Sequence, residues 1–347
     1  MKVLVTGHNG YIGGVLVPMF EAAGHEVVGL DTFFYEGCDF GAQNREIPAL
    51  RLDLRQVEPR HLAGFDAVVH LAALSNDPLG DLDPNLTYDI NHLASVRLAR
   101  AAKAAGVPRF LFSSSCSLYG AASPEECLTE AAAFNPVTAY GISKVRVEQD
   151  VATLADAYFS PTFLRNATAY GVSPRLRGDL VVNNLVGYAF ATGEVLIKSD
   201  GTPWRPLVHI RDISKAFLAI LHAPRESVHN EAFNIGLTSE NYQIRDVASM
   251  VEGIVPNCRV AYAEGAGPDL RCYRVDFGKV ARALPELQFE WTVQRGIEEL
   301  YDAYRTAGIT VEALQGRYLR IQRIRDLLGA GRLDSALRWQ AVAAGAR

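Results

Sequence analysis

Two residues capable of acid–base chemistry lie four positions apart in the segment TAYGISK, residues 138–144. Tyr140 and Lys144 fall within a stretch, 137–157, whose pattern predicts a helix, so both side chains would lie on one face of that helix. An ammonium close to a phenol favours the tyrosinate form. A tyrosine in that form can take a proton from a sugar hydroxyl while a hydride leaves the same carbon. Alone, such a pair is commonly a solvated surface pair, so its meaning depends on the neighbouring motifs.

Three serines follow a predicted strand at 109–113, within the segment FSSSCSLYG, residues 112–120. Ligands of parallel sheets bind beyond the carboxyl ends of the strands, so a hydroxyl group there is placed to hydrogen-bond a reacting oxygen. Serines in such a position also cap the following turn. We expect the capping role for two of the three serines at 113–115.

The segment TGHNGYIGG, residues 6–14, joins the first predicted strand to the first predicted helix. Gly7, Gly10 and Gly13 would let the backbone approach a pyrophosphate closely, and the helix N-terminus would offer it free N–H groups. Asp31 ends the second predicted strand, 31 − 13 = 18 residues after the last glycine, where a carboxylate holds a ribose 2′-hydroxyl. That carboxylate repels a 2′-phosphate, so NAD is favoured over NADP.

Short apolar runs alternate with longer helical patterns through the first half of the chain. This alternation predicts βαβ units and an α/β fold, a Rossmann-type doubly wound parallel sheet with helices on both faces. The predicted strands are 2–6, 26–30, 66–71, 109–113 and 161–165, with a later one at 231–235, and the predicted helices are 11–23, 88–105 and 137–157. Residues 172–207 are rich in Arg, Pro, Gly and Asn and contain only short periodic pieces.

The composition of the chain excludes several classes of protein. The chain has 347 residues, 49% hydrophobic and 21% charged, which excludes disorder, collagen and coiled coil as descriptions of the whole chain. Its formal charge of −5 leaves no electrostatic footprint for DNA or RNA. The five cysteines are odd in number and lack the close spacing of a metal knuckle, so we expect reduced thiols and no metal.

The N-terminus enters a predicted strand directly, and we see no signal peptide. Apolar runs also fall short of the roughly 20 residues that cross a bilayer. We therefore expect a soluble cytoplasmic protein without a membrane partner.

Four motifs follow one another along the chain: TGHNGYIG, HLAA at 70–73, SSSCSLYG and YGISK. In this order they resemble the extended short-chain dehydrogenase/reductase family. Within that family the chain is similar to NAD-dependent nucleotide-sugar epimerases and dehydratases of the UDP-glucose 4-epimerase type. The resemblance covers residues 1 to about 300.

The resemblance implies a catalytic triad of Ser115, Tyr140 and Lys144, supported by Asn91 in YDIN. It implies NAD as the cofactor, with Asp53 as the acid that binds adenine. The cofactor-binding positions that it implies are Gly7, Asn9, Gly10, Tyr11, Ile12, Gly13, Asp31, Asp53, Leu54, Leu71, Ala72, Ala73, Ser113, Tyr140, Lys144, Asn166 and Thr168.

The resemblance also implies a nucleotide-diphosphate sugar as substrate. VVNNL at 181–185 resembles the paired asparagines that touch the diphosphate, and WRPLVHIRDI at 204–213 resembles an element with a phosphate-binding arginine. A guanidinium suits a diphosphate because its donors form a planar fork. The candidate substrate-binding residues are Ser75, Asn76, Ser115, Asn166, Asn184, Arg205 and Arg271, with Arg274 beside them. The family's usual arginine before the equivalent of Pro268 is absent here, where the chain reads AEGAG, so the base of the nucleotide stays open.

Three units are expected along the chain. Residues 1–171 plus 208–239 would form the NAD-binding domain, and 172–207 plus 240–310 a smaller α/β domain for the nucleotide sugar. Residues 311–347 would form a helical tail, packed on the body or in contact with a second copy. The resemblance suggests a homodimer through the helices at 88–105 and 137–157.

Three reactions compete. Epimerisation at carbon 4, through a transient 4-keto sugar, needs only the triad and NAD. For 4,6-dehydration, the enzymes that this chain resembles place an Asp-Glu pair directly after the catalytic hydroxyl residue, where this chain has Cys116 and Ser117. Reduction of a 4-keto sugar is suggested by SSC at 114–116, but the related reductases commonly use NADPH, which Asp31 opposes. A non-enzymatic dinucleotide sensor would be expected to lose the Tyr140–Lys144 pair. Epimerisation is the preferred hypothesis.

Overall fold

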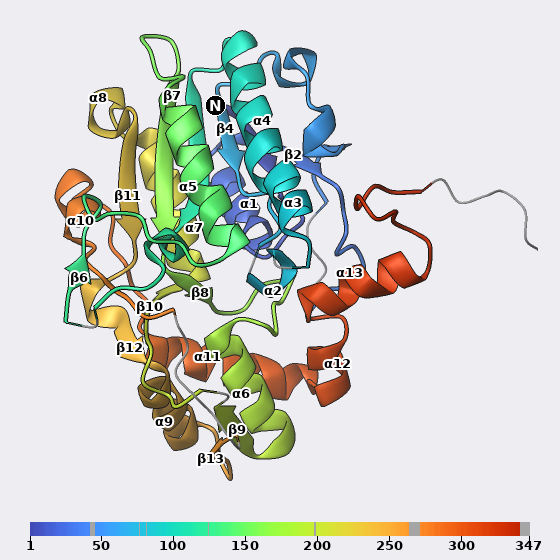
Figure 1. Ribbon diagram of the computed structural model, residues 1–347, viewed down its shortest axis with the longest axis vertical. Helices are drawn as coiled ribbons and strands as arrows, with labels where there is room; N and C mark the ends of the chain where they lie inside the picture. Colours follow the sequence, from blue (N-terminus) through green and yellow to red (C-terminus); the bar gives the residue numbers. More distant parts are fainter. Residues whose placement is uncertain are drawn as a thin grey trace, which may run out of the picture.

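The computed structural model describes residues 1–41, 46–75, 77–80, 82–123, 125–197, 199–263 and 271–340. In that part of the chain, a sheet of seven parallel strands has the order β11-β7-β5-β4-β1-β2-β3 (Figure 1). Its strands are β1 (Lys2–Thr6), β2 (Glu26–Asp31), β3 (Ala49–Arg51), β4 (Ala67–His70), β5 (Arg109–Ser115), β7 (Ser160–Asn166) and β11 (Glu231–Ile235). The strand order reverses between β1 and β4, which opens a crevice at their carboxyl ends. This arrangement confirms the expected Rossmann-type fold.

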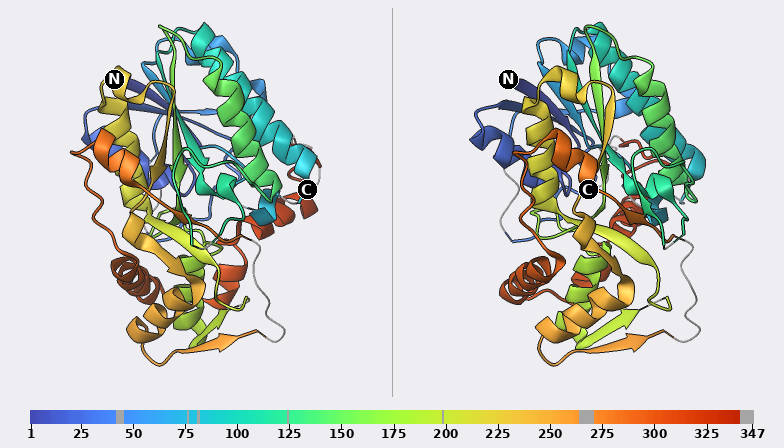
Figure 2. Two further views of the ribbon diagram at one scale, coloured as in Figure 1. Left: turned by 60° about the vertical axis from the view of Figure 1, so that its left-hand side comes forward. Right: turned by 90° about the vertical axis from the view of Figure 1, so that its left-hand side faces the viewer.

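Helices cover both faces of the central sheet (Figure 2). One face carries α1 (Gly13–Ala22) and α7 (Ile210–His222), and the other carries α4 (Ala94–Ala104) and α5 (Ala139–Ala152). Successive side chains of a strand point to opposite faces. Val3 and Val5 of β1 accordingly belong to the core on the α1 side, whereas Leu4 belongs to the core on the α4 side. Burial on both faces explains why these strands are apolar throughout.

A second body lies below the central sheet in Figure 1. It contains a three-stranded sheet in the order β12-β10-β8, a parallel pair β13-β9, and three helices around an apolar core. These elements are β8 (Thr168–Tyr170), β9 (Glu194–Ile197), β10 (Trp204–His209), β12 (Asn241–Gln243), β13 (Arg259–Tyr262), α6 (Val181–Thr192), α9 (Ile244–Ile254) and α11 (Val293–Ala307).

The expectation of only short periodic pieces between 172 and 207 is wrong, because α6 spans 12 residues there. Val182, Leu185, Val186 and Ala189 face the core of the second body at helical spacing. Adjacent asparagines obscure this pattern in the sequence. Gly193 ends the helix in the left-handed conformation, at φ 71°.

Smaller elements connect the two bodies and edge the sheet. They are the short helices α2 (Asp77–Gly80), α3 (Pro84–Thr87), α8 (Arg225–Val228) and α10 (Gly278–Ala283), the π-helical segment η3 (Tyr88–Leu93), the 3₁₀ turns η1 (Leu54–Gln56), η2 (Pro59–Leu62), η4 (Cys116–Tyr119) and η5 (Thr238–Glu240), and the pair β6 (Cys127–Leu128) with β14 (Arg274–Val275). The predicted helix at 88–105 is therefore η3 followed by α4.

After α11 the chain first packs α12 on α6, where Leu314 joins the core of the second body, and then returns to the central sheet. Residues 311–340 form α12 (Val311–Gln315), α13 (Arg320–Gly329) and a turn closed by a bridge between Leu333 and Trp339. The predicted helical tail is thus divided, and its remainder, 341–347, lies outside the described residues. Ile324 and Leu327 of α13 share a small core with Phe34, which follows β2, and with Leu74 and Leu79, which follow β4. Figure 1 shows α13 beside α2.

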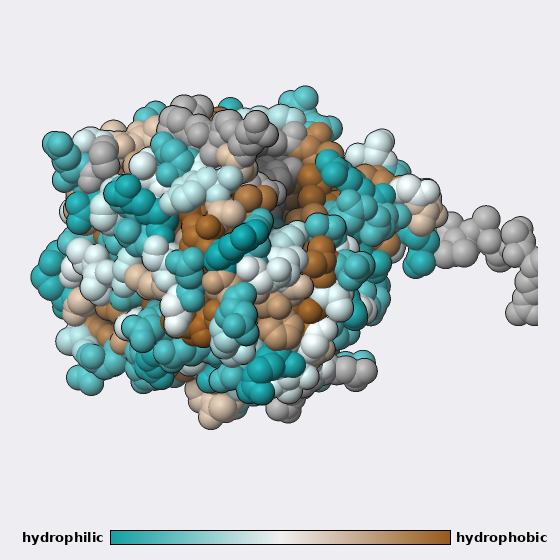
Figure 3. All heavy atoms as spheres, turned by 90° about the horizontal axis from the view of Figure 1, so that it is seen from below, coloured by the Kyte–Doolittle hydropathy of each residue, from teal (hydrophilic) through white to brown (hydrophobic). Residues whose placement is uncertain are grey.

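The surface seen from below carries both polar and apolar side chains. Apolar side chains appear there in separate patches, interrupted by polar ones (Figure 3). Among the helices of the described ranges, none is long and apolar enough to cross a bilayer. All five cysteines fall within those ranges and are unpaired.

A buried ion pair ties α5 to the sheet. Glu148 of α5 accepts hydrogen bonds from Arg165 of β7, at 2.7 Å from Nη2 and 3.1 Å from Nε, and from the hydroxyl of Ser114 on β5 at 2.5 Å. Both charged side chains are only 6% exposed. Removing one partner of such a pair leaves the other charge buried without compensation.

We therefore predict that Glu148→Ala lowers the free energy of unfolding by about 3–5 kcal/mol. Urea denaturation followed by circular dichroism measures the change. Glu298→Ala, which removes an exposed carboxylate from α11, is the control and should change stability little. A loss below about 1 kcal/mol for Glu148→Ala would show that Arg165 finds another partner or water.

Candidate active site

One cavity of about 870 Å³ lies at the carboxyl ends of the central strands and extends to the second body. This size suits a pocket for small molecules. Nearly all the residues predicted from the sequence line it. They are Gly7, Gly10, Tyr11, Ile12, Gly13, Asp31, Asp53, Leu54, Leu71, Ala72, Ala73, Ser75, Ser113, Ser115, Tyr140, Lys144, Asn166, Thr168, Asn184, Arg205 and Arg271.

Besides Arg274, which is described below, three predicted residues are placed differently. Asn76 lies outside the described residues. Asn9 and Asn91 stand behind the lining. The amide of Asn91 donates to the carbonyl of Leu74 at 3.0 Å and accepts from its N–H at 2.8 Å, so Asn91 holds the backbone that follows β4. It acts on the cavity through that segment.

The turn after β1 approaches the segment after β4 closely. Gly7 has φ 72°, and a Cβ on it would lie 2.8 Å from the backbone nitrogen of Ala72. A Cβ on Gly13 would lie 2.3 Å from the carbonyl oxygen of His8. Both contacts are shorter than van der Waals distance, so only glycine fits. The turn therefore presents its backbone to the cavity, directly before α1.

Two carboxylates lie beside that turn. Asp31 accepts the N–H groups of Asn9 and Phe33, at 3.1 and 2.7 Å, which orients its oxygens at the end of β2. Asp53 accepts three hydrogen bonds from the guanidinium of Arg55, the shortest at 2.6 Å. Burial alone would raise the pKa of Asp53, but Arg55 outweighs it and the pKa is lowered. Asp53 is therefore ionised near neutral pH.

The glycine turn is also bound to the chain that enters the second body. The hydroxyl of Tyr11 donates to the carbonyl of Gly171 at 2.7 Å. The Nε of Arg175 donates to the side-chain oxygen of Asn9 at 2.6 Å. These contacts join residues 9–11 to residues 171–175 and close the floor of the cavity.

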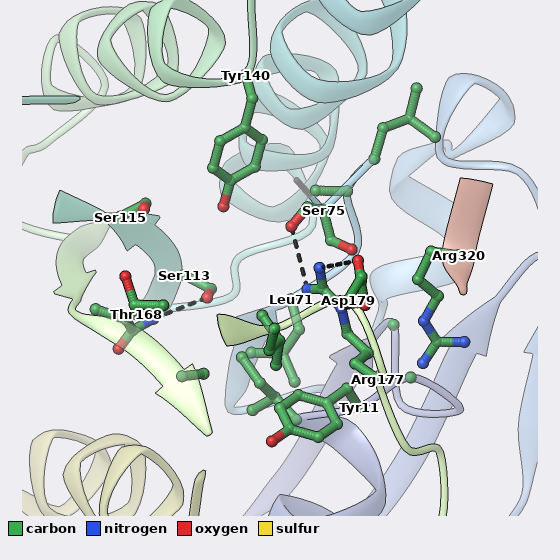
Figure 4. A pocket seen from close by; sticks show the side chains of 18 of the residues that line it. Tyr11, Leu71, Ser75, Ser113, Ser115, Tyr140, Thr168, Arg177, Asp179 and Arg320 are labelled. Carbon is green, nitrogen blue, oxygen red and sulfur yellow. Dashed lines mark hydrogen bonds and ion pairs between the residues drawn. The ribbon is translucent and has the colours of Figure 1, made fainter. Parts of the chain in front are cut away.

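Tyr140 and Lys144 come from the first turns of α5. Thr138 caps the helix by accepting the N–H of Gly141 at 3.2 Å, which leaves Tyr140 in the first turn. Figure 4 shows its hydroxyl pointing into the pocket. The Lys144 Nζ donates to the carbonyl of Ser113 at 2.6 Å and lies 5.5 Å from the centre of the Tyr140 ring. Burial lowers the pKa of Lys144 to about 7, against the opposing effect of Glu148.

The three serines of β5 have three different partners. Ser113 accepts from the amide of Asn166 at 3.1 Å, and Ser114 donates to Glu148. Ser115 accepts the N–H of Ser117 at 3.1 Å and so caps η4. The expectation that two of the three cap the turn is wrong: Ser113 and Ser114 point to opposite faces of the strand, and Ser115, its last residue, reaches the turn.

The second body contributes amides and guanidinium groups. Asn184 donates to the carbonyl of Gly178 at 2.7 Å and lines the cavity, whereas its neighbour Asn183 is buried against Gly171. Arg205 donates to the carbonyls of Trp204 and Arg271. Arg274, the other candidate, stacks on the Trp204 ring at 4.8 Å and is not among the lining residues. The AEGAG segment lies almost entirely outside the described residues.

Comparison with known proteins agrees with this geometry. The model of the NAD dependent epimerase/dehydratase family matches residues 3–236. The chain belongs to this family. A UDP-glucose 4-epimerase of Corynebacterium glutamicum is 31% identical over 271 residues, 72% of this chain and 79% of the relative.

Solved structures of other proteins share the fold. MoeE5 in complex with UDP-glucuronic acid and NAD superposes with a TM-score of 0.77 at 27% identity, covering 88% of this chain and 99% of MoeE5. The NDP-hexosamine 5,6-dehydratase TunA reaches the same TM-score at 24% identity and shows the fold alone. The protein is thus an enzyme of the NAD-dependent epimerase/dehydratase family.

The cavity fits the NAD of this family. The glycine turn leaves room for a pyrophosphate before α1, and Asp31 stands where a ribose hydroxyl would donate. Near Ser113, the side-chain oxygen of Asn166 is buried without a hydrogen-bond partner, so it offers an acceptor to an amide or hydroxyl. Within the described ranges, no cluster of three or more His, Cys, Asp or Glu side chains could hold a metal ion.

The sequence motifs missed several lining residues. Arg177 and Asp179 form an ion pair of 2.7 Å, with side chains 8% and 7% exposed, and Arg177 also donates to the carbonyl of Ser75. Burial would raise the pKa of Asp179, but Arg177 outweighs it and the pKa is lowered. Tyr35 and Arg320 line the cavity as well. Figure 4 shows Arg177, Asp179 and Arg320 on the side away from Ser115 and Thr168. The RLRGD run before α6 was the one sequence signal for Arg177 and Asp179.

We predict that the burial of Lys144 makes stability depend on pH. Folded Lys144 releases its proton near pH 7, whereas an unfolded lysine holds it to about pH 10.4. Between these values the unfolded chain binds more protons, so the free energy of unfolding rises with pH. The wild type should gain about 2–3 kcal/mol relative to Lys144→Met between pH 7 and pH 9.

Urea denaturation of both proteins at pH 6.5, 7 and 9 measures this difference, because other titrating groups are common to the two. A constant difference across that range would mean that Lys144 stays charged in the folded protein.

Proposed function

We propose that the protein is a nucleotide-sugar 4-epimerase in which Tyr140 is the catalytic base. One observation carries the proposal: Tyr140 and Lys144 open onto the same cavity as the glycine turn and Asp31, and no acid follows Ser115. Such a site can move one proton and one hydride at a single carbon. Neither Cys116 nor Ser117, the two residues after Ser115, is the carboxylic acid that related 4,6-dehydratases have there.

The first turn of α5 prepares Tyr140 for proton removal. The positive end of the helix dipole and the Lys144 ammonium both stabilise negative charge on the phenol oxygen. Ser115, at the end of β5, holds the sugar hydroxyl while Tyr140 takes its proton. NAD, which the glycine turn and Asp31 would hold, would supply reversible hydride transfer at carbon 4, so that the hydride can return to either face of the sugar. Tyr140 then gives the proton back.

The residues after Ser115 argue against dehydration. Cys116 is 1% exposed, its thiol donates to the carbonyl of Arg165 at 3.2 Å, and burial raises its pKa, so it stays a neutral thiol turned away from the cavity. Ser117 reaches the cavity but carries no acid. Removal of a proton at carbon 5 and of water at carbon 6 would therefore lack a carboxylic acid here.

The second body supports a nucleoside diphosphate sugar as substrate. Arg205, Arg271 and Asn184 line one cavity with the Tyr140 site, and a guanidinium pairs well with a diphosphate. The names of the relatives, a UDP-glucose 4-epimerase and a protein bound to UDP-glucuronic acid, favour a uridine nucleotide. We assign NAD to residues 1–171 plus 208–239 and the sugar nucleotide to 172–207 plus 240–310.

We also propose a homodimer in the cytoplasm. Leu93 of η3 and Val137 before α5 are 58% and 45% exposed, so apolar side chains remain on the helical layer formed by 88–105 and 137–157. Five unpaired cysteines suit a reducing compartment.

Proton NMR of purified protein mixed with UDP-glucose, UDP-galactose or UDP-glucuronic acid tests for epimerase activity. We expect a new anomeric signal, unchanged mass and no need for added reductant. Tyr140→Phe should lower the rate at least about 100-fold, because the base is gone. Tyr158→Phe, an 86% exposed tyrosine, is the matched control and should keep the rate.

An isomerisation that survives Tyr140→Phe would contradict the role of Tyr140. Loss of water from the sugar nucleotide, seen as a mass lower by 18 units, would replace the epimerase by a dehydratase. Turnover confined to a 4-keto sugar with added NADH would identify a reductase.

The dimer is tested by light scattering after size exclusion. Leu93→Asp should lower the mass to that of one chain, because a buried unpaired carboxylate destabilises an interface. Tyr262→Asp, at an exposed site on β13, should leave the mass unchanged. A wild type that elutes as one chain would end this proposal.

A further inference from the structure

The C-terminal strap, residues 311–340, binds the segment that follows β2. The Trp339 indole donates to the carbonyl of Thr32 at 2.6 Å. Arg323 of α13 donates to the carbonyls of Phe34 and Glu36, each at 3.2 Å. All these acceptors lie within five residues of Asp31, the carboxylate at the ribose end of the cavity. The strap therefore covers that end of the cavity.

Arg320, the first residue of α13, reaches from the strap into the cavity. It is 2% exposed, and its guanidinium stacks on the Tyr35 ring at 3.7 Å. Its Nη2 donates to the carbonyl of Arg175 at 3.0 Å. Arg175 in turn donates to Asn9 of the glycine turn. Arg320 is thus linked through Arg175 to the turn that faces the pyrophosphate.

The other terminal nitrogen of Arg320 has no partner. Its Nη1 is buried and makes no hydrogen bond within the protein. A buried charged donor left without an acceptor costs free energy, so this arrangement points to a ligand that supplies an anionic oxygen. The neighbouring carboxylate of Asp179 is paired with Arg177.

NAD carries its negative charge on the pyrophosphate, and the glycine turn places that group before α1. The substrate also carries a diphosphate, but its predicted ligands, Arg205 and Arg271, lie in the second body. The part of the strap from α13 onward makes its contacts at the opposite end, through Arg323 and Trp339 near Asp31, and Arg338 comes to 3.9 Å from Asp53. Position therefore favours the cofactor over the substrate.

We propose that Arg320 donates a hydrogen bond from Nη1 to the NAD pyrophosphate, which makes the C-terminal strap part of the cofactor site. This role depends on the family's use of NAD and is independent of the reaction performed on the sugar. It deepens the proposed function by assigning a positioning task to a segment outside both domains.

Binding tests the proposal without turnover. Protein freed of bound nucleotide on charcoal is titrated calorimetrically with NAD, ADP-ribose, adenosine and UDP. Arg320→Met should lower the affinity for NAD and for ADP-ribose by about 10–100-fold, because a hydrogen bond between charged groups is lost. The affinity for adenosine and for UDP should stay unchanged. Arg325→Met removes the same charge from an exposed position of α13 and should change none of the four.

Three results would overturn the assignment. An equal loss of affinity for adenosine and for NAD would mean that Arg320 acts by packing the strap against Tyr35. A loss of affinity for UDP, with NAD affinity unchanged, would mean that Arg320 contacts the substrate instead. Unchanged NAD affinity in Arg320→Met would remove the contact altogether.

A second variant covers the case in which Arg320→Met does not fold. Arg320→Lys retains the buried charge but loses the planar fork. It should weaken NAD and ADP-ribose several-fold while adenosine keeps its affinity. A parallel loss of NAD and adenosine affinity in Arg320→Lys would count against the pyrophosphate contact in the same way. A wild type that binds NAD normally but turns over no nucleotide sugar would contradict the proposed function and leave the role of Arg320 intact.

Discussion

The close approach of two backbone segments governs the site. Gly7 after β1 and Ala72 after β4 leave no room for a Cβ, and this contact falls where the strand order of the sheet reverses. A side chain at Gly7 would separate the ends of β1 and β4 and fill the space before α1. Because α1 and the Leu74 backbone follow these two strands, and Asp31 of β2 is hydrogen-bonded to Asn9 of the turn, the cofactor end of the cavity depends on that contact.

Charge is distributed unevenly along the cavity. At one end Asp31 and Asp53 face Arg55 and the C-terminal strap, and in the middle Lys144 is a buried amine with a low pKa. An uncharged lysine is a weaker electrostatic partner, so a ligand that adds negative charge nearby favours the protonated form. Binding of an anionic ligand beside Lys144 would therefore favour protonation of Lys144 and, in the proposed mechanism, activation of Tyr140.

Local pattern was sufficient for the central sheet and for the motifs. The predicted strand at 2–6 coincides with β1, the glycine spacing identified the turn, and the spacing of Tyr140 and Lys144 placed both on α5. Helix α6 and the divided strap were not predicted, because polar residues interrupt their apolar periodicity. Arg320 was unpredictable for a different reason. It lies more than 300 residues from the glycine turn, and only the packing of the strap on the segment after β2 brings the two together.

The two bodies are joined at both ends of the cavity. At the glycine turn, the hydroxyl of Tyr11 bonds the carbonyl of Gly171. At the other end, next to Arg271, the N–H of Ala122 donates to the carbonyl of Cys272 at 2.9 Å, and β14 pairs with β6. A hinge rotation of the second body would have to break one of these two attachments. The fold therefore fixes the separation between the glycine turn and Arg271, so the cavity selects its ligands by their length.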